Sequence, residues 1–404
     1  MAKRVQGKAT SKTTAASKGK AADKGKAADK GKAADKGKAA DKGKAADKGK
    51  AAGKSKVAGK SKVAGKSKSY RVAIVGATGV VGREMLRTLE ERRFPVSEIR
   101  LLASERSVGE ILEFGEEEIR VGLLDDKSLG GLDLALFSAG SDVSLKYAPL
   151  AAEKGCVVID NTSAFRRDED VPLVVPEVNA GDLAAYTLRG IIANPNCSTI
   201  QMVVALKPLH DAAGLKRVVV ATYQSVSGAG QSGVKELEQQ CRDLFNMREL
   251  SVGHFGRQIA FNCLPQIDVF EADGYSREEH KMMHETRKIL HLPDLPLSAT
   301  TVRVPVFYGH AEAVNVELQK PLTQAEAREL LSQAPGILLM DDPEEGQYPT
   351  PIDAAGRDET LVGRVRVDPS VPAGLDLWVV ADNVRKGAAL NSVQIAECLV
   401  ADFL

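Results

Sequence analysis

Cys197 is the residue whose local sequence points most clearly to chemistry. Residues 191–201 read IIANPNCSTIQ, so a short apolar strand runs into Asn-Pro-Asn and a helical pattern begins near the cysteine. A thiol at a helix N-terminus meets unpaired N–H groups and the positive end of the helix dipole, which favour the nucleophilic thiolate. The sequence therefore predicts a reactive Cys197. The remaining cysteines lack this setting and are expected to be inert: Cys156, Cys241, Cys263 and Cys398.

A second segment, RVPVFYGH at residues 303–310, offers a cation and an imidazole close together in the chain. A β-like stretch begins at Arg303 and leads through a Tyr-Gly turn to His310. A guanidinium can hold a carboxylate through two parallel hydrogen bonds, and an imidazole can transfer protons near neutral pH. A histidine after a glycine turn is more often structural than catalytic, so on these residues alone both interpretations of His310 stay open.

A glycine-rich turn near residue 76 has the context of a phosphate-binding loop. Residues 70–75 (YRVAIV) fit a buried strand, GATGVVG follows at 76–82, and a helical pattern with Val81, Met85 and Leu89 comes next. Glycines let the backbone approach a pyrophosphate, and the helix N-terminus offers free N–H groups. The spacing is GxxGxxG rather than GxGxxG, so an ordinary tight turn is the alternative.

The end of the next expected strand, residues 100–103, favours NADP over NAD. It runs into Ser104-Glu105-Arg106-Ser107. An NAD site places a carboxylate on the ribose 2′-hydroxyl, whereas an NADP site uses arginine and hydroxyl groups around a 2′-phosphate. Glu105 fits the first pattern, but neighbouring side chains of an extended segment point in opposite directions. Arg106 by itself also fits a solvated surface charge.

Further strand–helix units complete an α/β pattern. Residues 132–137 form an expected strand ending in Ser-Ala-Gly, a helix is expected over about 141–154, and another strand at 156–159 ends in Asp-Asn. Such strand ends line the cofactor crevice of a doubly wound sheet.

A thiolate beside a nicotinamide indicates one reaction class, in which sulfur attacks an activated acyl group and the resulting thioester accepts a hydride.

The charge of the chain is divided between two unlike segments. Its formal net charge is +1, yet residues 1–69 contain 22 lysines and arginines against five aspartates, which leaves 33 basic and 49 acidic residues in 70–404. Residues 21–50 are five copies of AADKGK, and three related repeats follow. A segment with so few apolar residues cannot offset its ordering entropy, so we expect a disordered tail. It could contact nucleic acid or another anion non-specifically, or have no dedicated partner.

The cysteine pattern and the hydropathy pattern limit the cellular compartments in which the protein is expected. Five widely spaced cysteines without a CxxC pair indicate neither a disulfide framework nor a zinc site, and no metal is expected. No apolar run reaches the ~18 residues of a membrane span. The N-terminus lacks the apolar region of a secretory signal. We expect a cytoplasmic protein with no membrane partner.

Eight motifs, in order, make the sequence similar to the aspartate-β-semialdehyde dehydrogenase family. They are GATGVVG, SERSVG, DNTSAFR, NPNCSTIQ, YQSVSGAG, EEHKMMHETRKIL, RVPVFYGH and DNVRKGAA, and they extend over about residues 70–404. The resemblance implies NADPH-dependent reduction of L-aspartyl 4-phosphate to aspartate semialdehyde with release of phosphate. That step belongs to lysine (through diaminopimelate), threonine, methionine and isoleucine biosynthesis. The lysine-rich tail is not part of the family pattern.

The resemblance also implies roles for residues around the substrate. Cys197 resembles the nucleophile that forms the acyl-thioester, and His310 the general acid and base. Glu278 matches the residue that holds the substrate amine, although EEHKMMHETRK otherwise reads as a charged helix face. The other implied substrate-binding residues are Gln224 for orientation, Arg303 for the α-carboxylate, Arg166 and Lys281 for the phosphate, and Asn196 near the phosphate.

On the cofactor side the resemblance implies three groups of contacts. The pyrophosphate loop matches Thr78, Gly79, Val80 and Val81; the 2′-phosphate contacts match Arg106 and Ser107; and the nicotinamide half matches Ser227, Gly228 and Asn383.

The expected fold is α/β with a disordered N-terminal tail over residues 1–69. A Rossmann-type NADP-binding domain is expected over 70–196 and a mixed α/β catalytic and dimerisation domain over 197–382. A C-terminal helix over 383–404 should pack back on the first domain. A homodimer, or a tetramer of dimers, is the expected assembly.

Three rival enzymes and one rival of another class share parts of this pattern. N-acetyl-γ-glutamyl-phosphate reductase has the same fold and mechanism, but its acylated substrate amine has less use for Glu278. Glyceraldehyde-phosphate dehydrogenase does not fit the order of motifs after Cys197, and a malonyl-CoA reductase of this fold is conceivable. A nucleic-acid-associated protein with an idle dehydrogenase body is the rival of another class, and the intact Cys197, Gln224, Arg303 and His310 argue against it.

Overall fold

The computed structural model describes residues 68–404. The repeat segment falls almost entirely on residues 1–67, so its expected disorder and its expected contact with nucleic acid lie outside the described residues. In the described part of the chain, no helix is long and apolar enough to cross a membrane.

The first half of the described chain forms a six-stranded parallel sheet. Its strand order is β5-β2-β1-β6-β7-β8. This is the order of a doubly wound dinucleotide-binding fold, and the direction of winding reverses between β1 and β6, where such folds bind their ligands. The strands are β1 Tyr70–Val75, β2 Val96–Ala103, β5 Gly122–Leu123, β6 Leu134–Phe137, β7 Val157–Asp160 and β8 Ile191–Ala193.

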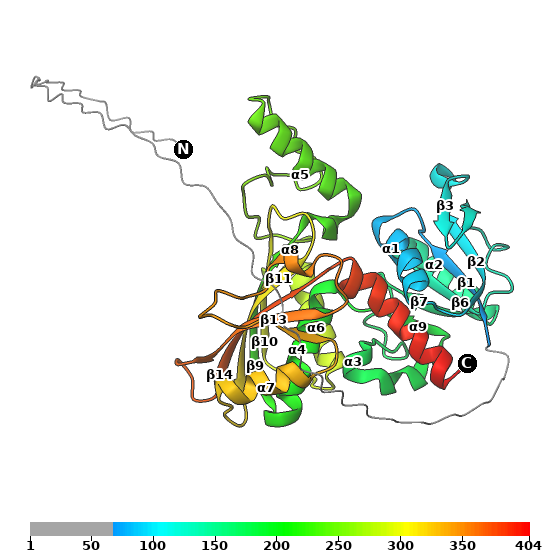
Figure 1. The fold of residues 1–404 in the computed structure, drawn as a ribbon. Helices are drawn as coiled ribbons and strands as arrows, with labels where there is room; N and C mark the ends of the chain where they lie inside the picture. The colour runs from blue at the N-terminus through cyan, green and yellow to red at the C-terminus, as the bar shows by residue number, and fades with distance from the viewer. Residues whose placement is uncertain (1–67) are drawn as a thin grey trace, which may run out of the picture. The chain divides into compact units, whose positions relative to one another are not determined.

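Helices cover both faces of this sheet because its strands are apolar on both sides. In β1, Val72 and Ile74 face the cluster that contains α1 (Val80–Glu91) and α9 (Leu390–Asp402). Ala73 and Val75 face the cluster that contains α2 (Ser141–Glu153). Figure 1 shows α9, the red C-terminal helix, lying against the blue N-terminal layer beside α1.

The C-terminal helical segment begins close to the expected residue 383. A π-helix over Arg385–Ala389 leads directly into α9, which begins at Leu390. In this π-helix the N–H of Gly387 bonds the carbonyl of Asp382 at 2.9 Å, an i→i+5 spacing typical of a π-turn. The Asp382 carboxylate accepts the N–H groups of Val384 and Arg385 at 2.8 and 2.9 Å, which stabilises the start of this helical segment.

The second sheet is mixed. Its strand order is β10-β9-β11-β14-β13-β12, with β10 parallel to β9, β12 parallel to β13, and antiparallel pairs elsewhere. Its strands are β9 Leu215–Gln224, β10 Leu297–Arg303, β11 His310–Leu318, β12 Ile337–Leu339, β13 Thr360–Asp368 and β14 Gly374–Ala381. We keep residues 196/197 and 382/383 as our proposal for the domain boundaries.

The remaining elements flank the two sheets. Helix α6 begins with a capping box between Ser276 and Glu279, which explains why the charged stretch after Ser276 is helical. These elements are β3 Ile111–Phe114, β4 Glu117–Arg120, α3 Pro176–Asn179, α5 Gly230–Phe245, α6 Arg277–Ile289, α7 Gln324–Gln333 and α8 Pro351–Ala354.

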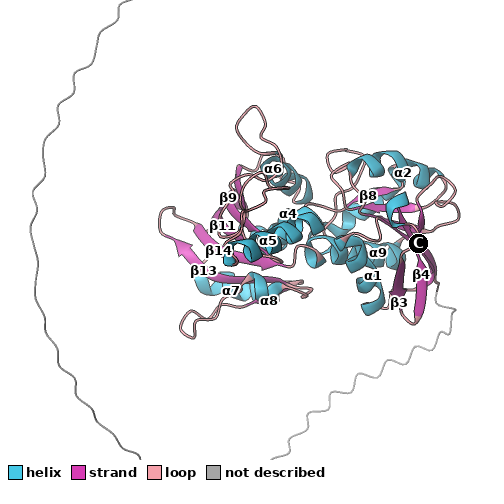
Figure 2. Ribbon diagram, turned by 90° about the horizontal axis from the view of Figure 1, so that it is seen from above, coloured by secondary structure: helices cyan, strands magenta, loops and turns pink. Residues whose placement is uncertain are grey.

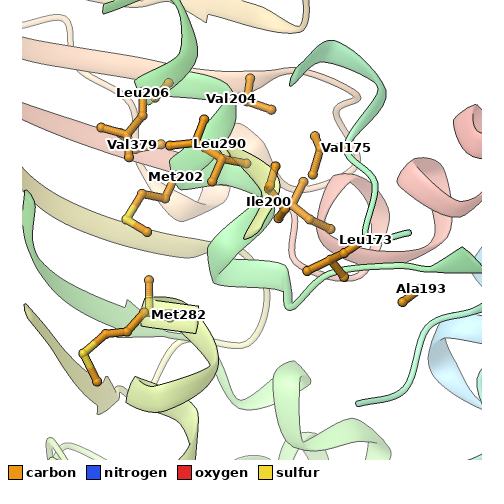
Figure 3. Packing of buried hydrophobic residues seen from close by; sticks show 14 of the residues in the cluster. Leu173, Val175, Ala193, Ile200, Met202, Val204, Leu206, Met282, Leu290 and Val379 are labelled. Carbon is orange, nitrogen blue, oxygen red and sulfur yellow. The ribbon is translucent and has the colours of Figure 1, made fainter. Parts of the chain in front are cut away.

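Helix α4 (Cys197–Ala213) lies between the two sheets and is buried along most of its length (Figure 2). Its side chains join one cluster with residues of both sheets. In Figure 3, Ile200 and Met202 point into this cluster, with Leu173 and Val379 among their surroundings. Because α4 is anchored on both sides, its first residue, Cys197, is held at a fixed place.

Strand register brings distant parts of the chain to one edge of the second sheet. The parallel strands β9 and β10 end side by side, with Gln224 paired to Arg303. The antiparallel β11 starts at that edge with His310, which pairs with Ala381 at the end of β14. Asn383 follows two residues later.

Candidate active site

A cleft of about 980 Å³ joins the edge of the second sheet to the loops that follow β1, β6 and β7 of the first sheet. Most of the residues that the sequence analysis singled out line this cleft. They are Thr78, Gly79, Val80, Val81, Arg166, Asn196, Cys197, Gln224, Ser227, Gly228, Glu278, Lys281, Arg303 and Asn383. Arg106, Ser107 and His310 are not part of its lining.

The glycine-rich turn presents main-chain atoms rather than side chains to the cleft. Gly76 has a φ of +88°, and a Cβ there would lie 2.6 Å from the carbonyl oxygen of Ser138. A Cβ on Gly82 would lie 2.2 Å from the carbonyl oxygen of Gly76, so α1 could not approach β1 as closely. Gly79 caps α1 without a side chain, and the first turn of α1 carries no acidic residue. This cradle fits a dinucleotide pyrophosphate, since its N–H groups meet no competing carboxylate.

The outer end of the cradle carries hydroxyl groups and a cation. The Thr78 hydroxyl donates to the Ser107 hydroxyl at 3.1 Å, which joins the glycine-rich turn to the end of β2. Arg106 precedes Ser107 in a short 3-10 turn and is exposed. These side chains are free to surround a ligand that extends beyond the cleft.

Cys197 is the first residue of α4, as the sequence predicts. Asn196 caps the helix, and its side-chain oxygen accepts the N–H of Ser198 at 3.1 Å. Burial and the nearby Glu278 carboxylate raise the pKa of the Cys197 thiol to about 12, although Arg303 counteracts them. These influences oppose the helix N-terminal effect on which the expectation of a resting thiolate depended. In the ligand-free site the thiol retains its proton near neutral pH.

His310 lies just behind the cleft. Its side chain is fully buried, and its Nδ1 accepts the backbone N–H of Ser225 at 3.0 Å. A neutral imidazole that accepts at Nδ1 carries its proton at Nε2. Burial and the charge of Arg303 hold the pKa of His310 well below its ordinary value, so the ring is neutral. A Cβ on Gly228 would lie 3.1 Å from Nε2, so this glycine lets the ring reach the cleft.

Glu278 is a buried carboxylate among donors. It accepts hydrogen bonds from the Asn196 amide at 2.9 Å, from Lys281 at 3.1 Å and from Gln224 at 3.4 Å. Burial acts to raise the pKa of Glu278, but the charge of Lys281 and the hydrogen bond from Asn196 outweigh it and hold the pKa below its ordinary value. Glu278 is therefore an anion in the ligand-free site.

Two cations line the same cleft, and one of them, Lys281, contacts this carboxylate. Arg166 donates to Glu285 at 3.1 Å and to the carbonyl of Asn161 at 3.0 Å, while its Nε has no partner among residues 68–404. Lys281 also contacts Asp268 at 3.0 Å. Each cation is oriented by a carboxylate and retains donors for an anion in the cleft.

Arg303 and Asn383 fix the turns next to His310 through hydrogen bonds. Arg303 is 6% exposed and donates to the Ser225 carbonyl at 2.7 Å. The side-chain oxygen of Asn383 accepts the hydroxyls of Ser225 and Ser227 at 3.0 and 3.1 Å and the N–H of Gly309 at 3.0 Å. This network holds the turns around the His310 ring.

The sequence analysis missed two residues that position side chains of the site. Glu285 bonds Arg166 and also accepts the backbone N–H of Asn196 at 2.6 Å. The helical period could have identified it, because Glu278, Lys281 and Glu285 are spaced i, i+3, i+7 on one face of α6. Ser225, the partner of His310, has no such signal.

Two family models match the chain. One, described as the NAD binding domain of semialdehyde dehydrogenase, matches residues 71–186. The other, described as the dimerisation domain of semialdehyde dehydrogenase, matches residues 206–386. The first match falls on the parallel sheet and its glycine-rich cradle, and the cofactor is accordingly a nicotinamide dinucleotide.

Relatives and solved structures agree with these models. The aspartate-semialdehyde dehydrogenase of Aquifex aeolicus is 57% identical over 337 residues, which cover 83% of this chain and 99% of the relative. That of Legionella pneumophila is 56% identical, covering 82% of this chain and 96% of the relative. The crystal structure of aspartate semialdehyde dehydrogenase II complexed with ASA from Vibrio cholerae has a TM-score of 0.81 at 54% identity, covering 84% of this chain and 100% of that one. The chain belongs to the aspartate-semialdehyde dehydrogenase family.

Proposed function

We propose that this protein converts L-aspartyl 4-phosphate to L-aspartate 4-semialdehyde with NADPH, in the pathway to lysine, threonine, methionine and isoleucine. The single observation that carries the proposal is the cleft itself. It places the Cys197 thiol near an anion, Glu278, and near a cation, Arg303. Two further cations, Arg166 and Lys281, and the glycine-rich dinucleotide cradle line the same cleft. Few substrates other than an amino-acid acyl phosphate need all of these groups.

Each charged group of the substrate has a counterpart in the cleft. Glu278 suits the amine, since it is an anion whose partners are two amides and a lysine. Arg303 suits the α-carboxylate because a guanidinium can bind it through two hydrogen bonds. Arg166 and Lys281 suit the phosphate, with Asn196 beside them and Gln224 placed to orient the acyl group.

The acyl transfer balances without an external base. The Cys197 sulfur forms a bond to the acyl carbon, the carbon–oxygen bond to phosphate breaks, and the thiol proton leaves with the phosphate. Arg166 and Lys281 stabilise the charge that builds on the departing phosphate. The product is a thioester on Cys197, which is consistent with a thiol that is protonated before the substrate binds.

The reduction uses His310 as an acid first and as a base second. When bound, the nicotinamide supplies a hydride to the thioester carbon. The Nε2–H of His310 is placed to protonate the carbonyl oxygen, in keeping with the tautomer that Ser225 selects. His310 then takes that proton back as the carbon–sulfur bond breaks, which releases the aldehyde and leaves Cys197 as a thiolate. A proton from solvent restores the thiol.

NADP is the cofactor we propose within the nicotinamide class. Support comes from Ser107, which bonds Thr78 of the glycine-rich turn, and from the neighbouring cation Arg106. A 2′-phosphate at this point would meet a guanidinium and two hydroxyls. Glu105 is the one acidic residue of the same turn, and it is exposed.

The test is phosphate-dependent reduction of NADP⁺ and of NAD⁺ by aspartate semialdehyde. We expect turnover with NADP⁺ by the wild type, no turnover by Cys197→Ala, and normal turnover by Cys263→Ala, an exposed cysteine outside the cleft. Phosphate-dependent activity with N-acetylglutamate semialdehyde and none with aspartate semialdehyde would instead assign the rival reductase. We disfavour that rival because an acylated amine leaves Glu278 without a cationic partner from the substrate.

Assembly and location complete the proposal. We propose a homodimer formed by the domain whose family model is described as a dimerisation domain, with light scattering as the measurement. A cytoplasmic location stays a prediction. Non-specific contact of residues 1–69 with nucleic acid also stays a prediction; equal DNA binding by the full chain and by a deletion of these residues, across a salt titration, would contradict it.

A further inference from the structure

A second cavity lies next to the cleft, on the side of the two cations that suit the substrate phosphate. It has a volume of about 700 Å³, and we call it the side cavity. It shares Ser163, Arg166 and Lys281 with the lining of the cleft and no other residue of the described part of the chain. Neither the glycine-rich cradle nor Cys197 lines it. A ligand in the side cavity therefore reaches Arg166 and Lys281 without contacting the dinucleotide cradle.

The side cavity carries an excess of positive charge, which favours an anionic ligand. One wall is a single face of α6, whose contributing side chains are spaced i, i+4, i+7 and i+11: Arg277, Lys281, His284 and Lys288. Six basic residues line the whole cavity against three acidic ones. The basic residues are Arg166, Arg167, Arg277, Lys281, Arg287 and Lys288, and the acidic residues are Glu169, Glu271 and Glu285.

Three of these cations keep N–H donors that have no partner among residues 68–404. Arg167 is exposed and makes no ion pair or hydrogen bond with these residues. Arg287 uses only its Nε, which donates to the carbonyl of Leu295 at 2.9 Å. Arg166 is 8% exposed, and its buried Nε has no partner. These N–H groups are available to a ligand.

Other contacts fix the walls of the side cavity. Lys288 donates to three main-chain carbonyls of residues 166–171, at 3.1, 2.7 and 2.8 Å, which holds the segment that carries Arg166 and Arg167 against α6. Burial, followed by the charges of Arg167 and Arg287, holds the pKa of His284 below its ordinary value. Both guanidinium groups therefore lie near this ring.

Inorganic phosphate is the ligand whose chemistry fits these observations. It is a small oxyanion with more than one negative charge, and guanidinium groups bind its oxygens through paired hydrogen bonds. In the proposed reaction, phosphate is released at Arg166 and Lys281 while the thioester remains on Cys197 and the dinucleotide occupies its cradle. The side cavity is the space next to Arg166 and Lys281 that neither of these occupants contacts.

We propose that the side cavity binds inorganic phosphate and connects Arg166 and Lys281 to solvent while the dinucleotide is bound. The choice of phosphate rests on the proposed function, whereas the anion site itself rests on the cavity and its free donors. Arg167 and Arg287 are the residues outside the cleft that act on the phosphate at this site.

Arg167→Gln tests this route in the assay that consumes phosphate. Because the side chain is exposed, we expect kcat/KM for phosphate to fall about fivefold, while the KM values for aspartate semialdehyde and NADP⁺ stay unchanged. Arg167→Lys keeps the charge and should stay close to the wild type. Arg242→Gln, an exposed arginine of α5 paired with Glu238, is the matched control. An unchanged kcat/KM for phosphate in Arg167→Gln overturns the proposal, as does an equal fall in Arg242→Gln.

A binding measurement separates this test from the substrate assignment. His284 lines the side cavity but not the cleft, so the NMR signal of its ring reports on the side cavity. Phosphate is titrated into the ligand-free protein with isotope-labelled histidine, at constant pH and ionic strength. We expect a saturable shift of the His284 signal in the wild type, a smaller shift in Arg167→Gln, and none for His291, an exposed histidine paired with Asp182.

The outcomes of the titration are distinct. No saturable shift at His284, or the same shift in Arg167→Gln, contradicts the anion site. A saturable shift that Arg167→Gln diminishes, in a protein that does not oxidise aspartate semialdehyde, supports the site and rejects the substrate assignment alone.

Discussion

The two sides of the cleft are built to hold their ligands by different means. The first sheet offers a bare backbone: glycines whose added Cβ atoms would collide with neighbouring carbonyls, a helix N-terminus, and a few exposed side chains such as Arg106. The second sheet and α6 offer buried ionic side chains, among them Glu278 and Arg303, at 5% and 6% exposure.

This difference determines how strongly each side depends on single side chains. Removing one partner of a buried charged pair leaves the other charge uncompensated, which costs about 3–5 kcal/mol. An exposed ion pair contributes about 1 kcal/mol or less. Substitutions on the substrate side should therefore act mainly on turnover and substrate affinity, and those at the outer cofactor end mainly on cofactor affinity.

The largest effect should come from His310→Asn. The variant keeps a polar side chain but removes the proton carrier, and we expect kcat to fall about 10²- to 10⁴-fold. Steady-state assays with saturating NADP⁺ measure it, with His291→Asn, an exposed histidine paired with Asp182, as the control. A fall of less than tenfold would contradict the role of His310 as the proton carrier.

Arg303→Lys should have the next largest effect. Lysine keeps the charge but not the planar pair of donors, so we expect kcat/KM for aspartate semialdehyde to fall about 10- to 100-fold, as for the loss of one or two charged hydrogen bonds. The KM for NADP⁺ should not change. Arg277→Lys, an exposed arginine on α6, is the matched control; equal losses in both variants would show that buried placement is not the cause.

Glu278→Gln tests the electrostatics of the thiol in the ligand-free enzyme. The Glu278 carboxylate raises the pKa of Cys197, so its removal should lower that pKa from about 12. Below the pKa, each unit of decrease raises the thiolate fraction about tenfold, and we expect alkylation by iodoacetamide at pH 8 to be up to about tenfold faster. Glu317→Gln, the control, changes a carboxylate of β11 that is paired with Lys216 outside the cleft and should leave the rate unchanged. Slower alkylation in Glu278→Gln would reverse the assigned sign.

The smallest effect should come from Arg106→Ala. The side chain is exposed, so we expect the KM for NADP⁺ to rise about fivefold while kcat and the KM for NAD⁺ stay unchanged. Initial rates with both cofactors measure this, and Arg87→Ala on the exposed face of α1 is the control. Equal changes with NADP⁺ and NAD⁺ would contradict a 2′-phosphate contact at Arg106.

The sequence alone was enough for the fold class and for most of the cleft. Strand, glycine-rich turn and helix are contiguous around Gly76, and strand, Asn-Pro-Asn and helix are contiguous around Cys197, so local periodicity and capping residues specify both. The C-terminal helix starts as a π-helix next to the buried Asp382 carboxylate, a detail that the apolar pattern does not reveal.

Tertiary structure decided the chemical state of the site. Cys197 is a protonated thiol because it is buried and because Glu278, 81 positions later in the chain, lies nearby. The tautomer of His310 follows from the N–H of Ser225. Glu285 acquires its importance only when α6 packs against the start of α4. Residue types and spacing along the chain determined which groups this protein has for catalysis; only packing determined which charges lie close together in a medium of low dielectric, where proton affinities are set.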